Sequence, residues 1–297
     1  MQQLPFCPNP LCVYHKDAPN DRWFRFHGYY STRIFGRIPR FMCTGCRKSF
    51  SSQTFSIEYY VKKRVPLRDL FLRHAEAQSC RAISRALHIS PGTVQNRIDR
   101  LARQSLAIHA KLRSRAIAKE DICVDGFVSF DHSQYFPSEI TLSTTSRSQF
   151  VLELSHASRK RSGIMRPAQI EKAVSLYAAT NFERGAVSRT FRDILDTLAA
   201  LRPPEINSPL VLITDEKPEY QRILFRHPLF LRQDPDHRIA HVRIWSKLPR
   251  TFSNPLFASN YIDRQLRKDQ ANHHRETVCF NRNVANGLSR FACYLAY

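Results

Sequence analysis

The spacing of hydrophobic and polar positions changes twice along the chain. Residues 1–50 are rich in turn formers, aromatic residues and cysteine, and show little helical periodicity. From residue 66 to residue 116, apolar residues recur at helical spacing, as in Val94, Ile98 and Leu101. The pattern therefore predicts a small, turn-rich module followed by a helical one.

After residue 119 the pattern changes to short apolar stretches, partly β-branched, that alternate with helical segments. The expected strands are Ile122–Val128, Glu139–Ser143, Gln149–Leu154, Leu210–Thr214 and Arg238–Ile244. The expected helices are 168–201, Pro218–Phe225 and Tyr261–Tyr297, with a loop at Ser155–Arg166 and a turn at Asn254–Leu256. This order predicts an α/β domain whose mixed sheet gathers strands from distant parts of the chain.

Charge is distributed unevenly along the 297 residues. Lysine and arginine number 46 against 25 acidic residues, a formal charge of +21. Residues 1–120 hold 22 basic and 7 acidic residues, whereas the other 177 hold 24 and 18. A concentrated positive half favours a polyanionic partner such as DNA over a merely soluble basic surface.

The sequence also bears on location. No apolar run approaches the roughly 20 residues of a membrane span. The opening Met-Gln-Gln-Leu-Pro has no basic region followed by an apolar stretch, so no secretory signal is expected. These features predict a cytoplasmic, nucleoid-associated protein.

Four cysteines form two short pairs near the start of the chain, Cys7-x4-Cys12 and Cys43-x2-Cys46. Zn²⁺ takes four tetrahedral ligands, and such short spacings let two thiolates reach one ion without strain. A module of about 50 residues buries little core, so a structural Zn²⁺ would supply folding free energy directly. Two alternatives stay open: His15 replaces Cys12 as a ligand, or the cysteines bind no metal.

The segment from Ser79 to Leu101 has the design of a helix-turn-helix. Ser90 can cap the second helix, with Pro91 at its first position, where a missing N–H costs little. Glutamine and asparagine can pair with adenine, and arginine with guanine or phosphate. The side chains expected to point outward and contact DNA are Thr93, Gln95, Asn96, Arg97 and Arg100. The competing interpretation is an ordinary helical hairpin with a basic face.

Two acidic residues lie at expected strand ends. Asp125 interrupts the strand Ile122–Val128, and Asp215 directly follows the strand Leu210–Thr214. Carboxylates at the ends of buried strands can converge at one edge of a sheet and hold two Mg²⁺ or Mn²⁺ ions that activate a water or hydroxyl. Strand-end caps or turn residues are the alternative interpretation.

A third carboxylate is expected from the late helix. Asp263 is favoured because it follows the turn at Asn254–Asn260, where the scaffold can fix it. Glu276 and Asp269 are alternatives on the same stretch. The neighbouring Arg264 and Arg267 are expected to contact phosphate.

Several segments of the sequence resemble those of a known protein family. The segment Phe41-Met-Cys-Thr-Gly-Cys-Arg-Lys-Ser-Phe50 is similar to the zinc-knuckle signature of bacterial insertion-sequence transposases. Val124–Gly126 and Leu212–Tyr220 resemble the first two acidic strands of a DDE-type catalytic domain. Asn260–Arg267 resembles the helix that holds the third acid, although this chain has aspartate where the family usually has glutamate. Arg275–Arg282 resembles the end of such domains.

The resemblance implies a particular fold and activity. It implies a zinc ribbon at 1–55, a helix-turn-helix at 60–116 and an RNase-H-like catalytic domain at 119–297. A transposase of this kind binds the terminal repeats of its element, cleaves DNA with Mg²⁺ and transfers strands to a target, usually as a homo-oligomer. The alternative is a DNA-binding transcriptional regulator with an inactive RNase-H-like domain, and a third interpretation is a nuclease without strand transfer.

Overall fold

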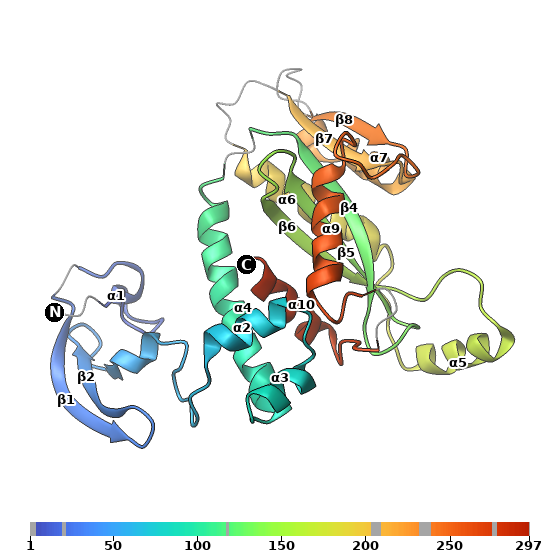
Figure 1. Ribbon diagram of the computed structural model, residues 1–297. Coiled ribbons are helices and arrows are strands. Elements are labelled where there is room, and N and C mark those ends of the chain that lie inside the picture. The colour runs from blue at the N-terminus through green and yellow to red at the C-terminus, as the bar shows by residue number, and fades with distance from the viewer. Residues whose placement is uncertain are drawn as a thin grey trace. The chain divides into compact units, whose positions relative to one another are not determined.

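The computed structural model describes residues 4–19, 22–116, 119–202, 209–231, 239–274 and 278–296. The chain divides into two compact units (Figure 1). Unit 1 extends to Leu67, and unit 2 covers Arg68–Tyr297.

Within its described residues, unit 1 contains a three-stranded antiparallel sheet in the order β1-β2-β3. Its elements are α1 (Val13–Lys16), β1 (Phe24–Thr32), β2 (Gly36–Cys43), β3 (Ser49–Ser51) and the 3-10 helix η1 (Ser52–Phe55). The pairing of β1 with β2 shifts between Phe26 and Tyr29, where Gly28 adopts a φ of +86°. A positive φ is inexpensive only for glycine, so this residue accommodates the bulge.

The core of unit 1 is small and mostly aromatic. Trp23 is 2% exposed and stacks on Phe50 with ring centroids 5.3 Å apart. Phe41 and the cysteines Cys7 and Cys43 complete this cluster. The predicted small β-structure is present, and its core is a small aromatic cluster that includes the cysteines.

Unit 2 combines a helical region with a five-stranded mixed sheet, counted over its described residues. Its strands are β4 (Ile122–Phe130), β5 (Pro137–Thr145), β6 (Val151–Ser158), β7 (Leu210–Asp215) and β8 (Ile239–Ile244). Its helices are α2 (Leu67–Ala75), α3 (Cys80–Ala86), α4 (Pro91–Arg113), α5 (Pro167–Ala178), α6 (Ala186–Leu201), α7 (Pro218–Leu224), α8 (Pro228–Leu231), α9 (Phe257–Asp269) and α10 (Val284–Tyr294). The predicted α/β sheet is therefore present.

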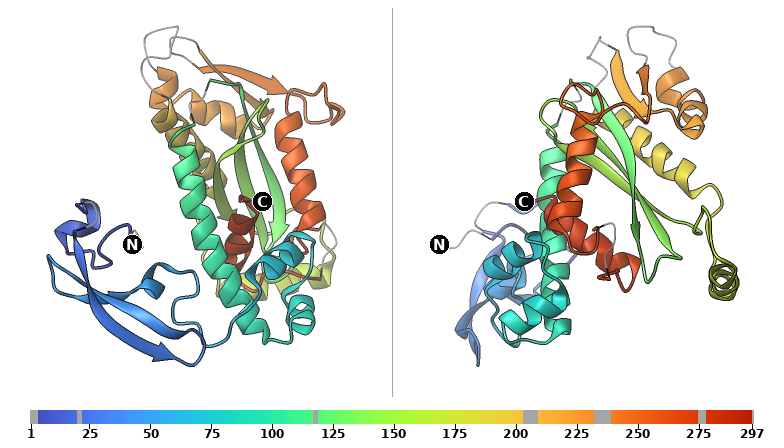
Figure 2. Two further views of the ribbon diagram at one scale, coloured as in Figure 1. Left: turned by 60° about the vertical axis from the view of Figure 1, so that its left-hand side comes forward. Right: turned by 45° about the vertical axis from the view of Figure 1, so that its right-hand side comes forward.

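The sheet order is β6-β5-β4-β7-β8, with β4, β7 and β8 parallel and β4, β5 and β6 antiparallel. Helix α6 packs on β5 and β6, and α9 packs on β4 and β5. The two helices cover opposite faces of the sheet (Figure 2). Side chains of β4 point alternately to the two faces of the sheet. Val124 packs in the core on the α6 side, and Phe127 packs in the core on the α9 side.

The helices predicted as a separate DNA-binding domain belong to the same compact unit as the sheet. The long helix α4 packs against α10, which lies near the end of the chain. His109 of α4 also approaches the Val151 carbonyl oxygen of β6 at 2.7 Å. Among the described residues, no helix has the length and apolar character needed to cross a membrane.

Three element boundaries differ from the sequence-based expectations. The expected helix 168–201 is two helices, because Gly185 takes a φ of +69° and α6 starts directly after it. The expected loop at 155–166 begins as strand, since β6 pairs with β5 as far as Ser158. The expected helix 261–297 is split into α9 and α10.

Candidate functional site

The four predicted zinc ligands lie together in unit 1. The Sγ atoms of Cys7 and Cys46 are 3.6 Å apart, and those of Cys12 and Cys43 are 3.7 Å apart. All four sulfurs lie within 4.8 Å of one another. A tetrahedral ion with bonds of about 2.3 Å would place its sulfur ligands about 3.8 Å apart. The cluster therefore fits one metal ion such as zinc.

Local sequence explains how the cysteines converge. Gly45 lies between Cys43 and Cys46, and a Cβ at this position would come within 2.8 Å of the Tyr14 ring. The glycine thus allows the second knuckle to approach the segment that carries Cys12. His15 is outside the cluster, because its Nδ1 donates a hydrogen bond to the Cys7 carbonyl oxygen at 2.7 Å.

The thiols differ in acidity. Burial raises the pKa of Cys7 to about 12. Burial opposes ionisation of Cys46 too, but hydrogen bonds from the Lys48 backbone and the Asn9 side chain lower its pKa to about 6. Thiolate is the form that binds metals, and these hydrogen bonds favour it at Cys46.

The segment predicted to be a helix-turn-helix has the expected cap at Ser90. The Ser90 hydroxyl accepts a hydrogen bond from the Thr93 backbone N–H at 3.1 Å, with Pro91 in the first turn of α4. The Ser79 hydroxyl caps α3 in the same way through the N–H of Ala82. The capping prediction is therefore confirmed.

The outward face of α4 differs from the expectation in one residue. Arg97 is only 6% exposed, because it lies on the same side of the helix as the buried Val94 and Ile98. Its expected outward orientation is thus wrong. Asn96 is exposed, and its side-chain oxygen accepts hydrogen bonds from Arg97 at 2.6 Å and from Arg100 at 3.3 Å.

The other two expected base contacts, Thr93 and Gln95, are partly exposed on α4. Gln95 donates a hydrogen bond to Asp99 at 2.8 Å, within the same helix. The polar side chains near the start of α4 are thus hydrogen-bonded to one another. Gln95 or Asn96 can contact a DNA base only if it gives up these hydrogen bonds.

The two acids expected at strand ends lie side by side in unit 2, but only Asp215 ends its strand, because β4 continues beyond Asp125 to Phe130. β4 and β7 are parallel neighbours, and Val124 pairs with Thr214. The next positions, Asp125 and Asp215, therefore follow in the same register and point to the same face. Both carboxylates line one open cavity of about 280 Å³.

Cations and a third carboxylate line this cavity as well. The Lys217 ammonium is 3.6 Å from Asp215 and 3.6 Å from Glu139, and Arg159 is 3.0 Å from Glu139. Glu139 has only 3% of its side chain exposed, so these cations compensate a carboxylate that is almost fully removed from water. Further lining residues include Arg250 and Asn260.

The electrostatics of the cavity are strongly coupled. Burial raises the pKa of Asp125 to about 6, and Lys217 counteracts this effect while the Asp215 charge adds to it. Burial would lower the pKa of Lys217, but Tyr220 and the three carboxylates outweigh it and raise that pKa. The two aspartates thus repel each other across a space where a cation would be stabilised.

The predicted third acid, Asp263, is not among the residues that line the cavity. Its carboxylate is 2.9 Å from Arg267 and 4.0 Å from Arg250. Asn260, one turn earlier on α9, lines the cavity instead. The alternative Asp269 accepts a hydrogen bond from the Tyr294 hydroxyl at 2.8 Å, and the alternative Glu276 lies outside the described residues.

The two expected phosphate contacts on α9 differ in availability. Arg264 is exposed. Arg267 is bonded to Asp263, donates to the carbonyl oxygens of His273 and Val128, and lies over the Phe127 ring. Arg267 therefore fastens α9 to β4, which leaves Arg264 as the α9 arginine that faces solvent.

Sequence reasoning missed Glu139 and Lys217. A signal for Glu139 was present, since it is an acid at the start of an otherwise uncharged predicted strand, 139–143. Lys217 follows Asp215 by two residues, but nothing in the sequence indicates that its ammonium turns back between carboxylates from two strands.

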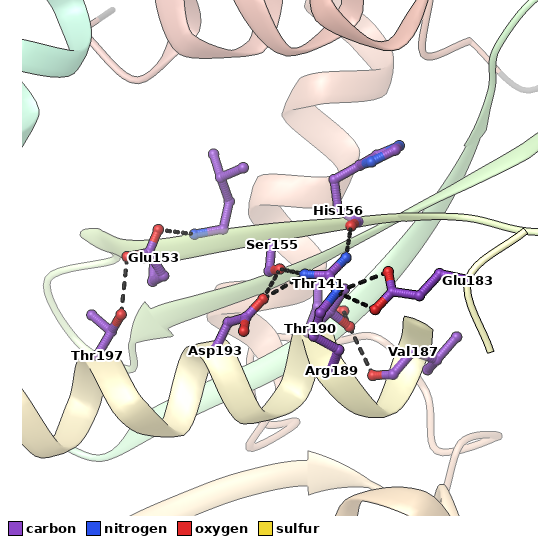
Figure 3. Close-up of polar contacts among 11 residues, drawn as sticks. Thr141, Glu153, Ser155, His156, Glu183, Val187, Arg189, Thr190, Asp193 and Thr197 are labelled. Carbon is purple, nitrogen blue, oxygen red and sulfur yellow. Dashed lines mark hydrogen bonds and ion pairs between the residues drawn. The ribbon is translucent and has the colours of Figure 1, made fainter. Parts of the chain in front are cut away.

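A second charged network in unit 2 is structural. Arg189 of α6 donates to Glu183, to Asp193 and to the His156 carbonyl oxygen of β6 (Figure 3). Asp193 also accepts from Ser155 at 2.7 Å. These bonds hold α6 against β6.

Comparison of the sequence with models of known protein families gives no match, and no curated protein is similar to it. Function is therefore inferred from the chain's own residues and their geometry.

Proposed function

We propose that this chain is a DNA-binding enzyme that transfers phosphoryl groups on DNA, of the transposase type. The observation that carries the proposal is the placement of Asp125 and Asp215 at matched positions of two parallel strands, lining one open cavity. A pair of carboxylates that repel each other on neighbouring strands is costly to keep, which favours a catalytic role over a role in stability.

The donor set fits hard divalent cations, because two carboxylates face one cavity. Asp125 and Asp215 would hold Mg²⁺ or Mn²⁺, which would supply Lewis acidity and activate a water or a 3′-hydroxyl. Lys217 and Arg250 line the same cavity and would orient the phosphate through charge-assisted hydrogen bonds. Asn260 offers a neutral amide at the start of α9.

DNA binding is supported by the charge distribution and the local structure around α3 and α4. Residues 1–120 carry 22 basic against 7 acidic residues. The capped α3–α4 pair has the form of a helix-turn-helix, whose second helix would enter the major groove of the terminal repeats. A structural Zn²⁺ on Cys7, Cys12, Cys43 and Cys46 would fold unit 1. Holding two DNA ends at once would require a second copy of the chain.

One observation favours a second candidate, a DNA-binding regulator with an inactive RNase-H-like domain. Two of the cavity's carboxylates, Asp215 and Glu139, already have the Lys217 ammonium at 3.6 Å. The predicted third acid, Asp263, is paired with Arg267. In this interpretation the cations replace metal ions, and the chain binds DNA without cutting it.

The two candidates are separated by one experiment. The purified full chain is incubated with a labelled duplex that carries the DNA flanking its gene, with Mg²⁺ and a supercoiled target plasmid. The transposase proposal predicts cuts that leave 3′-hydroxyls at a fixed position and label joined to the plasmid. Cutting without joining would indicate a nuclease, and binding without any cut would indicate the regulator.

A further inference from the structure

Unit 1 contains a groove, separate from the cysteine cluster, that is lined by aromatic residues. Its volume of about 480 Å³ falls in the range of ligand pockets. Its floor is apolar, with Ile38, Phe50 and Val61 buried. We call it the ribbon groove, and its ring-bearing and basic lining residues are Tyr30, Phe35, Phe50, Tyr59, Tyr60 and Arg40.

Several of these rings are available to a ligand. Tyr60 is 82% exposed, and its ring centroid lies 4.4 Å from that of Tyr59 in an edge-on arrangement. The Arg64 guanidinium lies 4.6 Å from the centroid of the Phe35 ring. An exposed aromatic ring such as that of Tyr60 can stack on a nucleic-acid base, and the exposed Arg64 in the same segment adds a positive charge.

The backbone holds Tyr60 in an unusual conformation. Its φ is +56°, a left-handed value that is uncommon for a large side chain. The strain costs free energy, and the ring gains little compensation from burial because it is mostly exposed. Strained residues of this kind cluster at binding sites, where a ligand makes use of the imposed orientation.

The charge of unit 1 indicates the chemistry of the ligand. Residues 1–67 include 11 lysines and arginines against 3 acidic residues, a net +8. Lys62 and Arg64 are exposed and directly follow Val61, which lines the groove. A phosphate backbone that runs past these residues would place its bases at the aromatic rings.

We propose that the ribbon groove binds the unpaired bases of a DNA strand. Aromatic side chains reach a base face only where the base is unstacked, so single strands fit this groove better than an intact duplex. DNA ends that are being cut and joined expose such bases. The inference uses none of the acidic-cavity residues, so it can fail while the proposed function stands, and the reverse also holds.

The test measures binding of a 12-nucleotide single strand that carries 2-aminopurine to the full-length, zinc-loaded chain. Wild type is expected to quench the 2-aminopurine fluorescence, because stacking on an aromatic ring quenches it. Tyr60→Gly removes the ring and also suits the positive φ, so this variant should fold at least as well as wild type. Its single-strand affinity should fall about tenfold, and the quenching should be lost.

Two control variants and one control ligand test whether the effect is specific to the ribbon groove. Tyr60→Phe keeps the ring and should bind like wild type. Phe26→Ala removes another exposed ring of unit 1 that does not line the groove, and it should change single-strand affinity less than twofold. Affinity of Tyr60→Gly for a blunt duplex of the same sequence should also change less than twofold.

Three outcomes would overturn the proposal. They are unchanged single-strand affinity and quenching in Tyr60→Gly, an equal loss of affinity for single strand and duplex, and an equal loss in Phe26→Ala. The second and third would assign the effect to a general contact surface rather than to the groove.

Discussion

Gly126 lines the acidic cavity at a position where a side chain would crowd two of the charged groups. A Cβ at this position would lie 3.1 Å from the Glu139 carboxylate and 3.5 Å from the Lys217 ammonium. Its backbone N–H also donates to the Asp125 carboxylate at 2.7 Å. The missing side chain thus lets groups from β4, β5 and the end of β7 meet in one space.

The third carboxylate can be identified by comparing two neutral substitutions. Glu139→Gln should reduce Mg²⁺-dependent DNA cleavage by about a hundredfold or more, because Glu139 lines the cavity with Asp125 and Asp215. Asp263→Asn should reduce cleavage by less than tenfold, because Asp263 is bound to Arg267 outside the lining. The measurement is the single-turnover cleavage rate at saturating Mg²⁺.

The opposite ranking would assign the third position to Asp263. Thermal denaturation of both variants serves as the control, because either substitution leaves an arginine without its carboxylate partner.

Burial disfavours the charged form of His74 and His273 in unit 2. Burial lowers the pKa of His74 to about 4 and that of His273 to about 3, and nearby arginines add to both shifts. The His74 Nε2 donates to the Arg290 carbonyl oxygen at 3.1 Å, and the His273 Nδ1 donates to the Ser129 hydroxyl at 2.8 Å. Neither ring has a carboxylate partner at hydrogen-bonding distance that would stabilise its charged form.

These shifts predict an acid sensitivity of unit 2. Histidine has a pKa of about 6.5 in the unfolded chain. Below this pH the two side chains are protonated in the unfolded chain but stay neutral in the folded chain. Each histidine thus contributes stability that is present above pH 6.5 and is lost as the pH falls toward 4. At pH 5.5 the loss should be about 1 kcal/mol for each ring.

Urea denaturation at pH 7.5 and pH 5.5 measures this effect. From pH 7.5 to pH 5.5, the free energy of unfolding of His74→Gln should decrease by about 1 kcal/mol less than that of wild type. The exposed control, His274→Gln, should behave like wild type. An identical pH difference in His74→Gln and wild type would show that His74 is protonated in the folded state.

At the scale of elements, unit 1 is expected to depend on its two cysteine pairs, which could hold a metal ion such as zinc. Its core contains few residues, and Trp23 lies in the cluster that includes the ligands Cys7 and Cys43. Removal of the metal should leave four thiols at distances near 4 Å with no ion to bind them together. Metal binding and folding of unit 1 should therefore be coupled.

Chelation tests this coupling through tryptophan fluorescence. The chain has two tryptophans, so Trp245→Phe leaves Trp23 as the sole reporter. A strong chelator should shift the Trp23 emission to longer wavelength, as the buried ring becomes exposed, with release of one Zn²⁺ per chain. Emission that stays unchanged after complete metal removal would show that unit 1 folds without the metal.

Helices and strands with a strong local sequence signal could be predicted, and those without one could not. The start of α4 was predicted correctly because Ser90 and Pro91 form a local cap. The break between α5 and α6 was missed, since helical periodicity continues through the sequence and only Gly185 marks the new start. The strand pairing that aligns Asp125 with Asp215 is a long-range property, and the sequence indicated only that both acids end apolar stretches.

Candidate site residues were predictable to a similar degree. The four cysteines could be identified from spacing, because the ligand chemistry is local to two short motifs. The inward position of Glu139 could not, because it depends on Arg159 and Lys217, which are distant in the chain, whereas the burial of Arg97 follows from its helical spacing to Val94 and Ile98. The α4–α10 contact, which covers the apolar side of α4, also joins residues distant in the chain.

At the scale of the whole molecule, the net charge of +21 predicts how DNA binding responds to salt. Neutralising about six phosphates would lower affinity about a thousandfold between 50 and 200 mM salt. Fluorescence anisotropy with a labelled duplex measures the slope. A nearly flat dependence would contradict a binding mode based on the basic N-terminal half.

We propose that Asp125 and Asp215 together make the chain a metal-dependent DNA-processing enzyme. The most direct measurement is the Mg²⁺-dependent cleavage rate of Asp125→Asn and Asp215→Asn, with the exposed neighbour Asp121→Asn as the matched control. We predict that each of the first two variants loses at least a thousandfold in rate while its DNA affinity stays unchanged, and that Asp121→Asn cleaves like wild type. Wild-type cleavage rates in both Asp125→Asn and Asp215→Asn would contradict the account.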